Sequence, residues 1–281
     1  MTKKIAIFGA NGFIGSSLSK YMIKKGCDIL AISKSSNNTH NYDNYVSIDL
    51  TIKSNWPYDL INRLKSCELI IFCAAIAHKT KINPFDTNII IIENFIYNFK
   101  SIQNLENKLI FLSTNDIQFI KDGFPERSNY FPYAYARSKL VSEKLLRDQI
   151  NNDLIIIRLP LVYSNNNSKD LLKRCRITIG GIPLYFKILP SPNYKVADVK
   201  DVCEFIYDLE TDINYKNNLI HYPAKLVTQY QLLSENSKLF FIIPKIIIRF
   251  LHWVFLNIPY LYFRERALNL QKLLDYDYNI D

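Results

Sequence analysis

Short apolar runs alternate with longer amphipathic stretches over the first 160 residues of the chain. The apolar runs predict buried strands, and they occupy residues 5–8, 29–32, 45–48, 69–72, 108–112 and 154–157. The amphipathic stretches between them predict helices, of which the first ends at about Lys25. Strands that alternate with helices in this way favour an α/β fold with a parallel, doubly wound sheet.

A glycine loop follows the first predicted strand. Only 7 of the 281 residues are glycine, well below the usual share of about 7%. Three of the seven fall in Gly9-Ala10-Asn11-Gly12-Phe13-Ile14-Gly15, directly before an amphipathic stretch. Glycines let the backbone approach a pyrophosphate, whose charge is favoured at a helix N-terminus. A strand, a glycine turn and a helix are the context that a dinucleotide-binding fingerprint requires.

A second motif consists of Tyr135 and Lys139, four residues apart in a predicted helix. At this spacing both side chains lie on one face of the helix, one turn from each other. A nearby ammonium favours the phenolate, so we expect the pKa of Tyr135 to fall toward neutral pH. Such a phenol can give a proton to a carbonyl oxygen or take one from a hydroxyl. The pair alone is weak, but its combination with the glycine loop indicates catalysis.

Together the two motifs resemble the extended short-chain dehydrogenase/reductase group of the NAD-dependent epimerase/dehydratase family, in which the loop reads G-x-x-G-x-x-G. The resemblance is strong from residue 3 to about 205 and weaker beyond. It implies a Rossmann-type NAD(P)-binding domain over residues 1–163, which also receives about 194–220. Residues 164–193 and 221–281 would form a small, partly discontinuous substrate-binding lobe.

The resemblance also implies a catalytic set. Thr114 lies 21 residues before Tyr135, which is the family's spacing, and its hydroxyl would hydrogen-bond the reacting oxygen. Lys139 would lower the pKa of Tyr135 and bind the nicotinamide ribose. Asn88 begins a stretch similar to the family's N-V-x-G-T-x-N helix, with Ile91 in place of the glycine. Asn88 would orient a water behind Lys139.

Cofactor contacts are expected at the glycine loop and where strands end at the carboxyl edge of the sheet, and the resemblance implies that Asp49, Leu50 and Pro160 are among them. The predicted cofactor-binding residues are Gly9, Asn11, Gly12, Phe13, Ile14, Gly15, Ser33, Lys34, Asp49, Leu50, Ala74, Ala75, Ser113, Tyr135, Lys139 and Pro160. Enzymes that prefer NAD usually carry an acid about 20 residues after the glycine loop. This chain has Ser33 and Lys34 there, which suit a 2′-phosphate. We therefore expect NADP (NADPH), with NAD as the alternative.

Three residues are candidates for substrate binding. His78 follows the fourth predicted strand, as in some sugar-nucleotide members of the family. Lys195 is the nearest substitute for an arginine that often binds the substrate diphosphate in those members. Asn115 directly follows Thr114, where the family's dehydratases commonly carry a proton-transferring side chain. An amide cannot transfer a proton at neutral pH, so dehydration is disfavoured.

Several functions remain open. The favoured one is NADPH-dependent reduction of the C4 ketone of a nucleoside-diphosphate 4-keto-6-deoxy sugar, as in the bacterial 4-ketoreductases of surface-polysaccharide synthesis that the chain resembles. The main alternative is an NAD-dependent sugar-nucleotide 4-epimerase. A second alternative is a regulatory module that binds NADP without turnover, which the presence of Thr114, Tyr135 and Lys139 together disfavours. The resemblance also implies a homodimer through the helices that flank the Tyr-x-x-x-Lys motif.

Composition adds the expected compartment and excludes some partners. The net charge is +9, but the lysines are scattered, so we expect no nucleic-acid partner. The five cysteines are isolated, which is typical of reduced thiols in a cytosol, and we expect no metal site. Residues 1–4 pass directly into the first predicted strand, so we expect no signal peptide. These features favour a cytoplasmic protein.

One apolar stretch, residues 246–263, could be mistaken for a membrane span. A spanning helix needs about 20 nearly uninterrupted apolar residues, whereas this stretch contains Arg249, His252 and Pro259. We therefore expect a buried or half-buried helix of the substrate lobe and no transmembrane segment. Attachment to a membrane surface or to a partner is the alternative.

Overall fold

The computed structural model describes residues 2–76, 84–102, 107–120, 134–150, 153–164, 176–179, 182–211, 218–234, 240–258, 270 and 274. These residues divide into two compact units. The first unit takes its residues from 1–129, 133–159 and 199–222, and the second takes most of its residues from 160–198 and 223–281. The boundaries differ from the expected ones by a few residues. Asn193–Asp198 belongs to the second unit because this strand pairs with two other strands of that unit.

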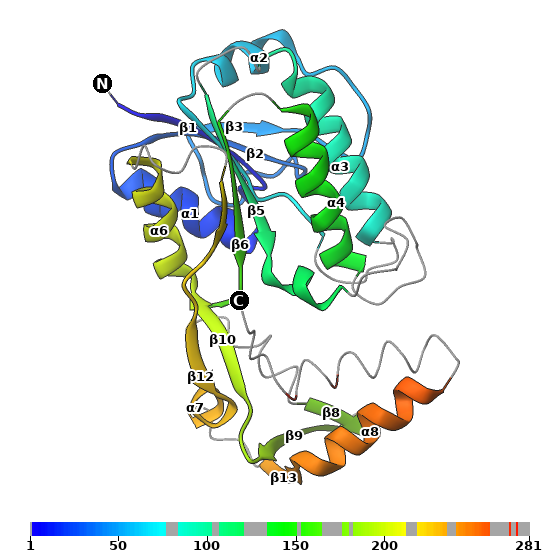
Figure 1. Ribbon diagram of the computed structural model, residues 1–281. Coiled ribbons are helices and arrows are strands. Elements are labelled where there is room, and N and C mark those ends of the chain that lie inside the picture. Colours follow the sequence, from blue (N-terminus) through cyan, green and yellow to red (C-terminus); the bar gives the residue numbers. More distant parts are fainter. Residues whose placement is uncertain are drawn as a thin grey trace. The chain divides into compact units, whose positions relative to one another are not determined.

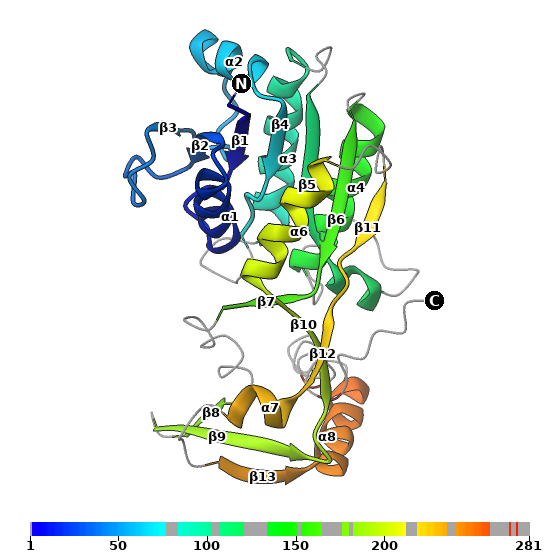
Figure 2. The same ribbon diagram turned by 90° about the vertical axis from the view of Figure 1, so that its left-hand side faces the viewer.

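A seven-stranded sheet, parallel at every pairing, forms the centre of the first unit. Its strands are β1 (Lys4–Phe8), β2 (Asp28–Ser33), β3 (Asn44–Ser47), β4 (Leu69–Phe72), β5 (Lys108–Thr114), β6 (Leu154–Leu159) and β11 (Leu219–His221). Their spatial order is β11-β6-β5-β4-β1-β2-β3, which Figure 2 shows. The order reverses between β1 and β4, so the sheet has the Rossmann-type switch point at which dinucleotides bind.

Helices cover both faces of this sheet (Figure 1). On one face lie α1 (Phe13–Lys24) and α6 (Val199–Thr211). On the other lie α2 (Tyr58–Lys65), α3 (Pro84–Phe99) and α4 (Ala134–Gln149), whose apolar residues share one core with the strands. A short 3₁₀ helix, η1 (Asn115–Phe119), follows β5. The predicted doubly wound α/β fold is thereby confirmed.

The main core lies between the sheet and the helices α2, α3 and α4. Because side chains alternate along a strand, Phe8 of β1 and Phe72 of β4 project to the same face and meet Phe95 of α3. Their ring centroids lie 5.0 Å and 4.6 Å from that of Phe95. Burying a side chain of this size contributes about 1.5–3 kcal/mol. The carboxyl ends of these strands are therefore a rigid platform.

The second unit contains two three-stranded sheets. One has the order β12-β10-β7 and the other β13-β9-β8. Their strands are β7 (Leu161–Tyr163), β8 (Arg176–Ile179), β9 (Ile182–Leu189), β10 (Asn193–Asp198), β12 (Lys225–Thr228) and β13 (Phe240–Pro244). Two helices, α7 (Gln229–Ser234) and α8 (Lys245–Asn257), belong to the same unit. Both sheets mix parallel and antiparallel pairs, unlike the sheet of the first unit.

Helix α8 is the described part of the apolar stretch that begins at residue 246. It ends at Asn257, one turn or more before the predicted end of the stretch. Ile248 packs in a buried cluster with Phe186, Ile188 and Leu274, so the predicted half-buried helix is confirmed. Among the described residues, no helix has the length and apolar character needed to cross a membrane.

Candidate active site

The glycine loop connects β1 to α1 at the switch point of the sheet. Gly9 has a φ of +85°, and a Cβ there would lie 2.8 Å from the backbone nitrogen of Ala74, just after β4. A Cβ on Gly15 would overlap the carbonyl oxygen of Gly9. That carbonyl already accepts a hydrogen bond from the Gly12 backbone N–H at 2.9 Å. The close approach of β1, β4 and α1 therefore requires glycine at positions 9 and 15.

The N-terminus of α1 lacks the usual protein caps. Gly12 is its N-cap residue, no side chain caps it, and its first turn contains no acidic residue. The first N–H groups of a helix have no intrahelical partners and carry partial positive charge. A pyrophosphate fits this position, since it can accept those hydrogen bonds. The residues present therefore fit a dinucleotide cofactor.

Asn11 is held by the segment that follows β2 and by β3. Its amide nitrogen donates to the Asn37 carbonyl at 3.1 Å and to the Tyr45 hydroxyl at 3.0 Å. Tyr42, from the same region, donates to the carbonyl of Ala10 at 2.9 Å. The glycine loop is thus joined to the segment after β2, next to the expected site of the adenosine ribose.

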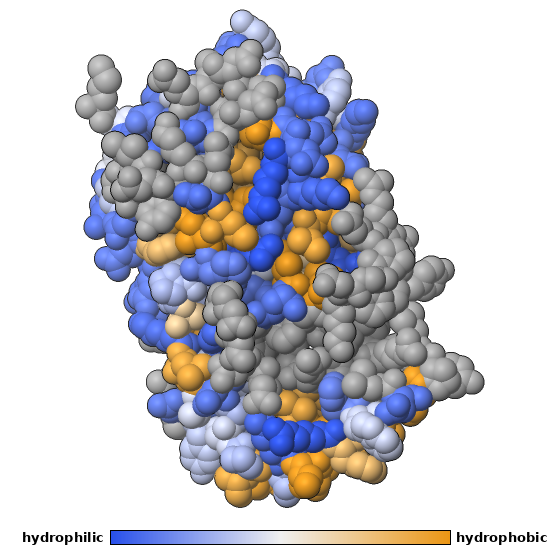
Figure 3. Space-filling model, viewed as in Figure 1, coloured by the Kyte–Doolittle hydropathy of each residue, from blue (hydrophilic) through white to orange (hydrophobic). Residues whose placement is uncertain are grey.

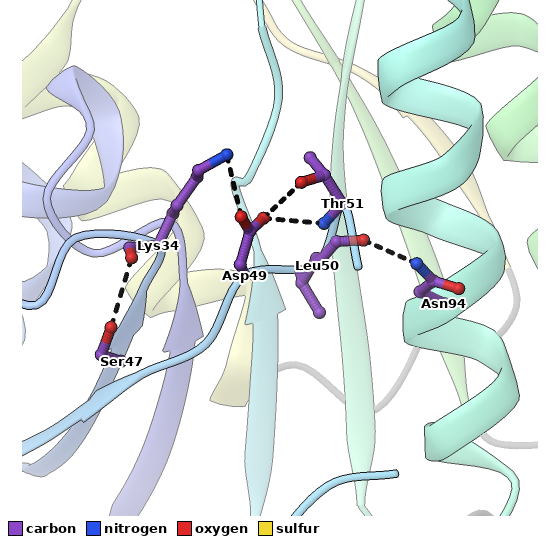
Figure 4. A network of polar contacts seen from close by, with 6 residues as sticks. All are labelled: Lys34, Ser47, Asp49, Leu50, Thr51 and Asn94. Carbon is purple, nitrogen blue, oxygen red and sulfur yellow. Dashed lines mark hydrogen bonds and ion pairs between the residues drawn. The ribbon is translucent and has the colours of Figure 1, made fainter. Parts of the chain in front are cut away.

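Two predicted cofactor residues, Lys34 and Asp49, contact each other (Figure 4). The Lys34 ammonium lies 3.0 Å from the Asp49 carboxylate, with side-chain exposures of 65% and 26%. Thr51 donates two hydrogen bonds to the same carboxylate, from its backbone at 2.9 Å and its hydroxyl at 2.6 Å. Burial alone would raise the pKa of Asp49, but the bonds from Thr51 and Lys34 outweigh it and lower that pKa. Asp49 therefore carries a negative charge beside Lys34.

Neighbouring residues also hold the backbone at Lys34 and Leu50 in place (Figure 4). The Leu50 carbonyl accepts a hydrogen bond from the amide of Asn94, on α3, at 2.9 Å. The Lys34 carbonyl accepts from the Ser47 hydroxyl at 3.2 Å. Ser33, at the end of β2, is half-buried. Three of the predicted cofactor residues, Ser33, Lys34 and Leu50, thus lie on ordered backbone at the ends of β2 and β3.

Asn88 joins the segment after β4 to α4, the helix that carries Tyr135 and Lys139. This buried amide accepts from the Ile76 backbone N–H at 2.8 Å and donates to the Ile76 carbonyl at 3.1 Å. It also donates to the Ser138 hydroxyl at 3.0 Å, which in turn donates to the Tyr135 carbonyl at 2.7 Å. Asn88 therefore fixes the turn of α4 between Tyr135 and Lys139. Its predicted water-mediated contact with Lys139 stays a prediction.

Thr114 ends β5 and begins η1. Its hydroxyl oxygen accepts a hydrogen bond from the Asp116 backbone N–H at 3.2 Å, so it serves as the helix cap. A hydroxyl that accepts one bond still has its own hydrogen to donate. Thr114 can therefore be both a cap and a hydrogen-bond donor to a reacting oxygen.

Lys139 is buried on α4. Its ammonium donates to the Leu112 carbonyl of β5 at 2.7 Å and lies 4.3 Å from the ring centroid of Phe111. Burial lowers the pKa of Lys139 to about 8, although Cys73 and Glu143 both favour the charged form. The lysine thus faces the end of β5, one helical turn from Tyr135.

The expected fall in the pKa of Tyr135 is wrong for this structure. Burial raises the pKa of the phenol above its usual value, and the negative charge of Asp116 raises it further. The ammonium of Lys139, on which the expectation rested, is hydrogen-bonded to the Leu112 carbonyl. Desolvation of the phenolate therefore outweighs any attraction by Lys139, and Tyr135 keeps its proton at neutral pH.

An ion pair between Arg158 and Glu143, one helical turn after Lys139 on α4, was not predicted. Arg158, at the end of β6, donates to both oxygens of Glu143, at 2.9 Å and 2.7 Å. The hydroxyl of Ser113 donates to the same carboxylate, so the side chain of this predicted cofactor residue faces Glu143. Glu143 lies four residues after Lys139 on α4, and that spacing is the signal by which the sequence could have indicated it.

Asn115 and His221 meet at the ends of β5 and β11. Nδ1 of His221 lies 3.2 Å from Oδ1 of Asn115. The amide nitrogen of Asn115 is buried and has no hydrogen-bond partner among the described residues. Burial, followed by the charge of Arg158, lowers the pKa of His221, and Glu143 acts against that shift. The contact of His221 with Asn115 was also missed, because nothing in the sequence relates residues 106 positions apart.

The remaining predicted residues are less informative. Ala74 and Ala75 are half-buried after β4, and Pro160 is buried between β6 and β7. Phe13 and Ile14 lie in the first turn of α1. Lys195 is half-buried in β10 of the second unit. His78 lies outside the described residues.

A sequence profile decides the family. The profile of the NAD-dependent epimerase/dehydratase family matches residues 5–181, which include the glycine loop, Thr114, Tyr135 and Lys139. The chain belongs to this family. A search of curated protein sequences found no match.

Solved structures of similar fold agree with this assignment. The enzyme WbmH of Bordetella bronchiseptica, in complex with NAD⁺, is 17% identical with a TM-score of 0.63, over 87% of this chain and 86% of that one. UDP-N-acetylglucosamine 4-epimerase from Bacillus cereus is 17% identical with a TM-score of 0.62, over 86% of each chain. Gre2 of Candida albicans, in complex with NADPH, is 16% identical with a TM-score of 0.63, over 84% and 83%. At these identities the likeness shows the epimerase/dehydratase family's Rossmann fold alone.

Proposed function

We propose that this family member is an NADPH-dependent 4-ketoreductase of a nucleoside-diphosphate 4-keto-6-deoxy sugar, acting in surface-polysaccharide precursor synthesis. One observation supports Tyr135 as the proton donor of such a reduction. Tyr135 is held in its neutral, proton-carrying form by burial and by Asp116. A reductase needs a proton donor at the carbonyl oxygen, whereas an oxidation must begin with a group that removes a proton.

The chain's own residues would act as follows. When bound, the nicotinamide cofactor supplies the hydride. Thr114 would donate a hydrogen bond to the carbonyl oxygen and keep its own proton, since its hydroxyl oxygen already accepts the bond from the Asp116 backbone. Tyr135 would give its phenolic proton to the same oxygen as negative charge develops there. Lys139, charged below a pH of about 8, would favour the resulting phenolate and bind the nicotinamide ribose.

The predicted NADPH preference depends on Lys34. Its side chain is 65% exposed, so it can turn toward a 2′-phosphate while remaining near Asp49. A phosphate carries about −1.5 to −2 charges, which makes it a stronger partner for the ammonium than one carboxylate. The Ser33 hydroxyl at the end of β2 would supply a hydrogen bond to the same group.

An NAD-dependent 4-epimerase is the second candidate, and the ion pair of Lys34 with Asp49 favours it. The Asp49 carboxylate lies 3.0 Å from the Lys34 ammonium and neutralises its charge. A site without net charge at this position suits the uncharged ribose hydroxyl of NAD. Asp49 repels a 2′-phosphate for the same reason. Among proteins of similar fold, one is a UDP-N-acetylglucosamine 4-epimerase and another is in complex with NADPH, so fold alone does not separate the candidates.

Asn115 is the best-supported substrate contact. Its amide nitrogen is buried and lacks a partner among the described residues, although its oxygen meets His221. A buried donor without a partner costs about 1–3 kcal/mol. A hydroxyl or carbonyl oxygen of a bound sugar would satisfy this donor next to Thr114.

The experiment compares two reactions of the purified protein. We expect oxidation of NADPH with a nucleoside-diphosphate 4-keto-6-deoxy sugar, and no interconversion of 4-epimers when no reductant is added. Tyr135→Phe should lower kcat by about 10²- to 10⁴-fold, the usual effect of losing a general acid, while NADPH still binds. Interconversion of UDP-sugar epimers with tightly bound NAD would instead favour the epimerase. Near-normal turnover of Tyr135→Phe would contradict both candidates.

A further inference from the structure

Helix α8 presents apolar side chains on its outer face as well as its inner one. Ile246, Phe250 and Trp253 lie at successive turns of the same face and are 74%, 60% and 62% exposed. The rings of Phe250 and Trp253 stack with centroids 6.3 Å apart. We call this surface the α8 patch, and it is extended by the exposed residues Phe241, Ile242 and Ile247.

The core of the second unit does not account for the α8 patch. The inner face of α8 already supplies Ile248, which is buried with Phe186 and Ile188. Soluble proteins rarely leave contiguous aromatic and aliphatic surface exposed unless it contacts something. Figure 3 shows hydrophobic residues over β13 and the start of α8, next to strongly hydrophilic ones. The patch therefore requires a separate explanation.

The charge around the patch is positive. Helix α8 carries Lys245 and the exposed Arg249, and residues 240–258 contain no acidic residue. The second unit has 13 lysines and arginines against 7 acidic residues, so it carries +6 of the chain's net charge of +9. Arg249 is exposed, and it lies three residues after Ile246 and directly before Phe250. Basic residues beside aromatic and aliphatic ones are typical of helices that lie in a membrane interface.

We propose that the α8 patch binds the surface of an anionic phospholipid bilayer, with the helix lying in the plane of the interface. Trp253 and Phe250 would enter the boundary between headgroups and acyl chains, the position that such rings favour. The exposed Arg249 would face the lipid phosphates. The helix has 13 residues and is therefore about 20 Å long, too short to cross a hydrocarbon core of about 30 Å.

A second copy of the chain is a poorer occupant of the patch. Two α8 helices that met face to face would bring the exposed Arg249 side chains of the two copies together. No carboxylate within residues 240–258 could neutralise them. Like charges in an apolar contact destabilise it, whereas an anionic bilayer supplies the opposite charge. This proposal concerns binding to lipid and is independent of the reaction that the enzyme catalyses.

The test uses the full chain and phosphatidylglycerol vesicles. The chain has two tryptophans, Trp56 and Trp253, and Trp56 is buried. A blue shift of the emission on adding vesicles therefore reports Trp253. We expect this shift, together with co-sedimentation, with phosphatidylglycerol vesicles but not with phosphatidylcholine vesicles. Salt should weaken the binding, and Arg249→Glu should weaken it at least fivefold, since each basic residue near an anionic surface contributes about that factor.

Two variants separate lipid binding from other causes. Phe250→Ser with Trp253→Ser should abolish co-sedimentation, whereas Tyr58→Ser, an exposed aromatic residue of the first unit, should leave it unchanged. If the double variant does not fold, quenching of the wild-type emission by brominated phosphatidylglycerol serves the same purpose. The proposal is wrong if anionic vesicles produce neither a shift nor co-sedimentation at low salt. It is also wrong if the double variant binds vesicles as well as the wild type does. The same holds if sedimentation equilibrium shows that the wild type is a dimer and that the main effect of the double substitution is to dissociate it.

Discussion

At the residue scale, Lys139 depends on neighbours that the Tyr-x-x-x-Lys motif does not contain. The buried ammonium is bonded to the Leu112 carbonyl, and Cys73 and Glu143 favour its charge. Without these neighbours, burial would lower the pKa of the lysine further. The Glu143 carboxylate is held in place by two hydrogen bonds from Arg158 and by one from the Ser113 hydroxyl. The charge of Lys139 is thus set by residues on three different elements.

Glu143→Gln should shift the pH dependence of the reaction. Loss of the carboxylate charge lowers the pKa of Lys139 below its present value of about 8. Because a lysine is charged only below its pKa, the charged form then disappears at a lower pH. The alkaline decline of kcat/KM for the cofactor, which reports the free enzyme, should therefore begin at a lower pH than in the wild type.

Glu143→Asp is the matched control, because it retains the negative charge on a shorter side chain. Its alkaline decline should remain near that of the wild type even if its maximal rate is reduced. A Glu143→Gln profile that falls in rate without moving along the pH axis would mean that Glu143 has only a structural role.

At the scale of elements, the junction of β1 and α1 determines whether a dinucleotide can bind. Gly15→Ala should abolish cofactor binding, because the added Cβ would overlap the Gly9 carbonyl oxygen within the loop. Gly26→Ala is the control. Gly26 also has a positive φ, of +84°, but a Cβ there meets no atom within 4 Å. It should cost about 1–2 kcal/mol of stability and leave cofactor binding intact, which equilibrium dialysis can measure.

Helix α8 has two apolar faces that should respond differently to truncation. Ile248→Ala removes a side chain buried with Phe186 and Ile188, and should cost about 2–5 kcal/mol in the free energy of unfolding. Ile246→Ala, two residues earlier and largely exposed, should change that free energy by no more than about 0.5 kcal/mol. Denaturant titration of both variants measures the difference. Equal costs would contradict the orientation of α8.

At the scale of the molecule, cofactor choice should appear in thermal stability. A ligand present at 100 times its Kd stabilises the folded state by about 2.7 kcal/mol. At about 2–4 °C per kcal/mol for a unit of this size, NADPH should raise Tm by about 5–10 °C. NAD at the same concentration should raise it less. Lys34→Ala should remove the difference, and a larger shift with NAD would favour the epimerase.

The sequence by itself determined most of the architecture of the first unit, although it did not predict β11. Apolar runs predicted six strands within two residues of their observed ends. Five of the six are largely buried and must therefore be apolar, whereas β3 is a half-exposed edge strand. The glycine loop was equally evident, since a positive φ at Gly9 and the close approach at Gly15 admit no side chain. These features are local: each is fixed by residues next to one another in the chain.

Only the tertiary structure decided how the site residues interact. The ion pair of Lys34 with Asp49 and the cluster of Glu143, Arg158 and Ser113 join residues from different elements. The raised pKa of Tyr135 follows from burial, which no spacing reports. A charge or a proton depends on desolvation and on the nearest opposite charge. Both are set by the packing of elements far apart in sequence, so the motif predicted which residues could be catalytic, while the fold determined their protonation.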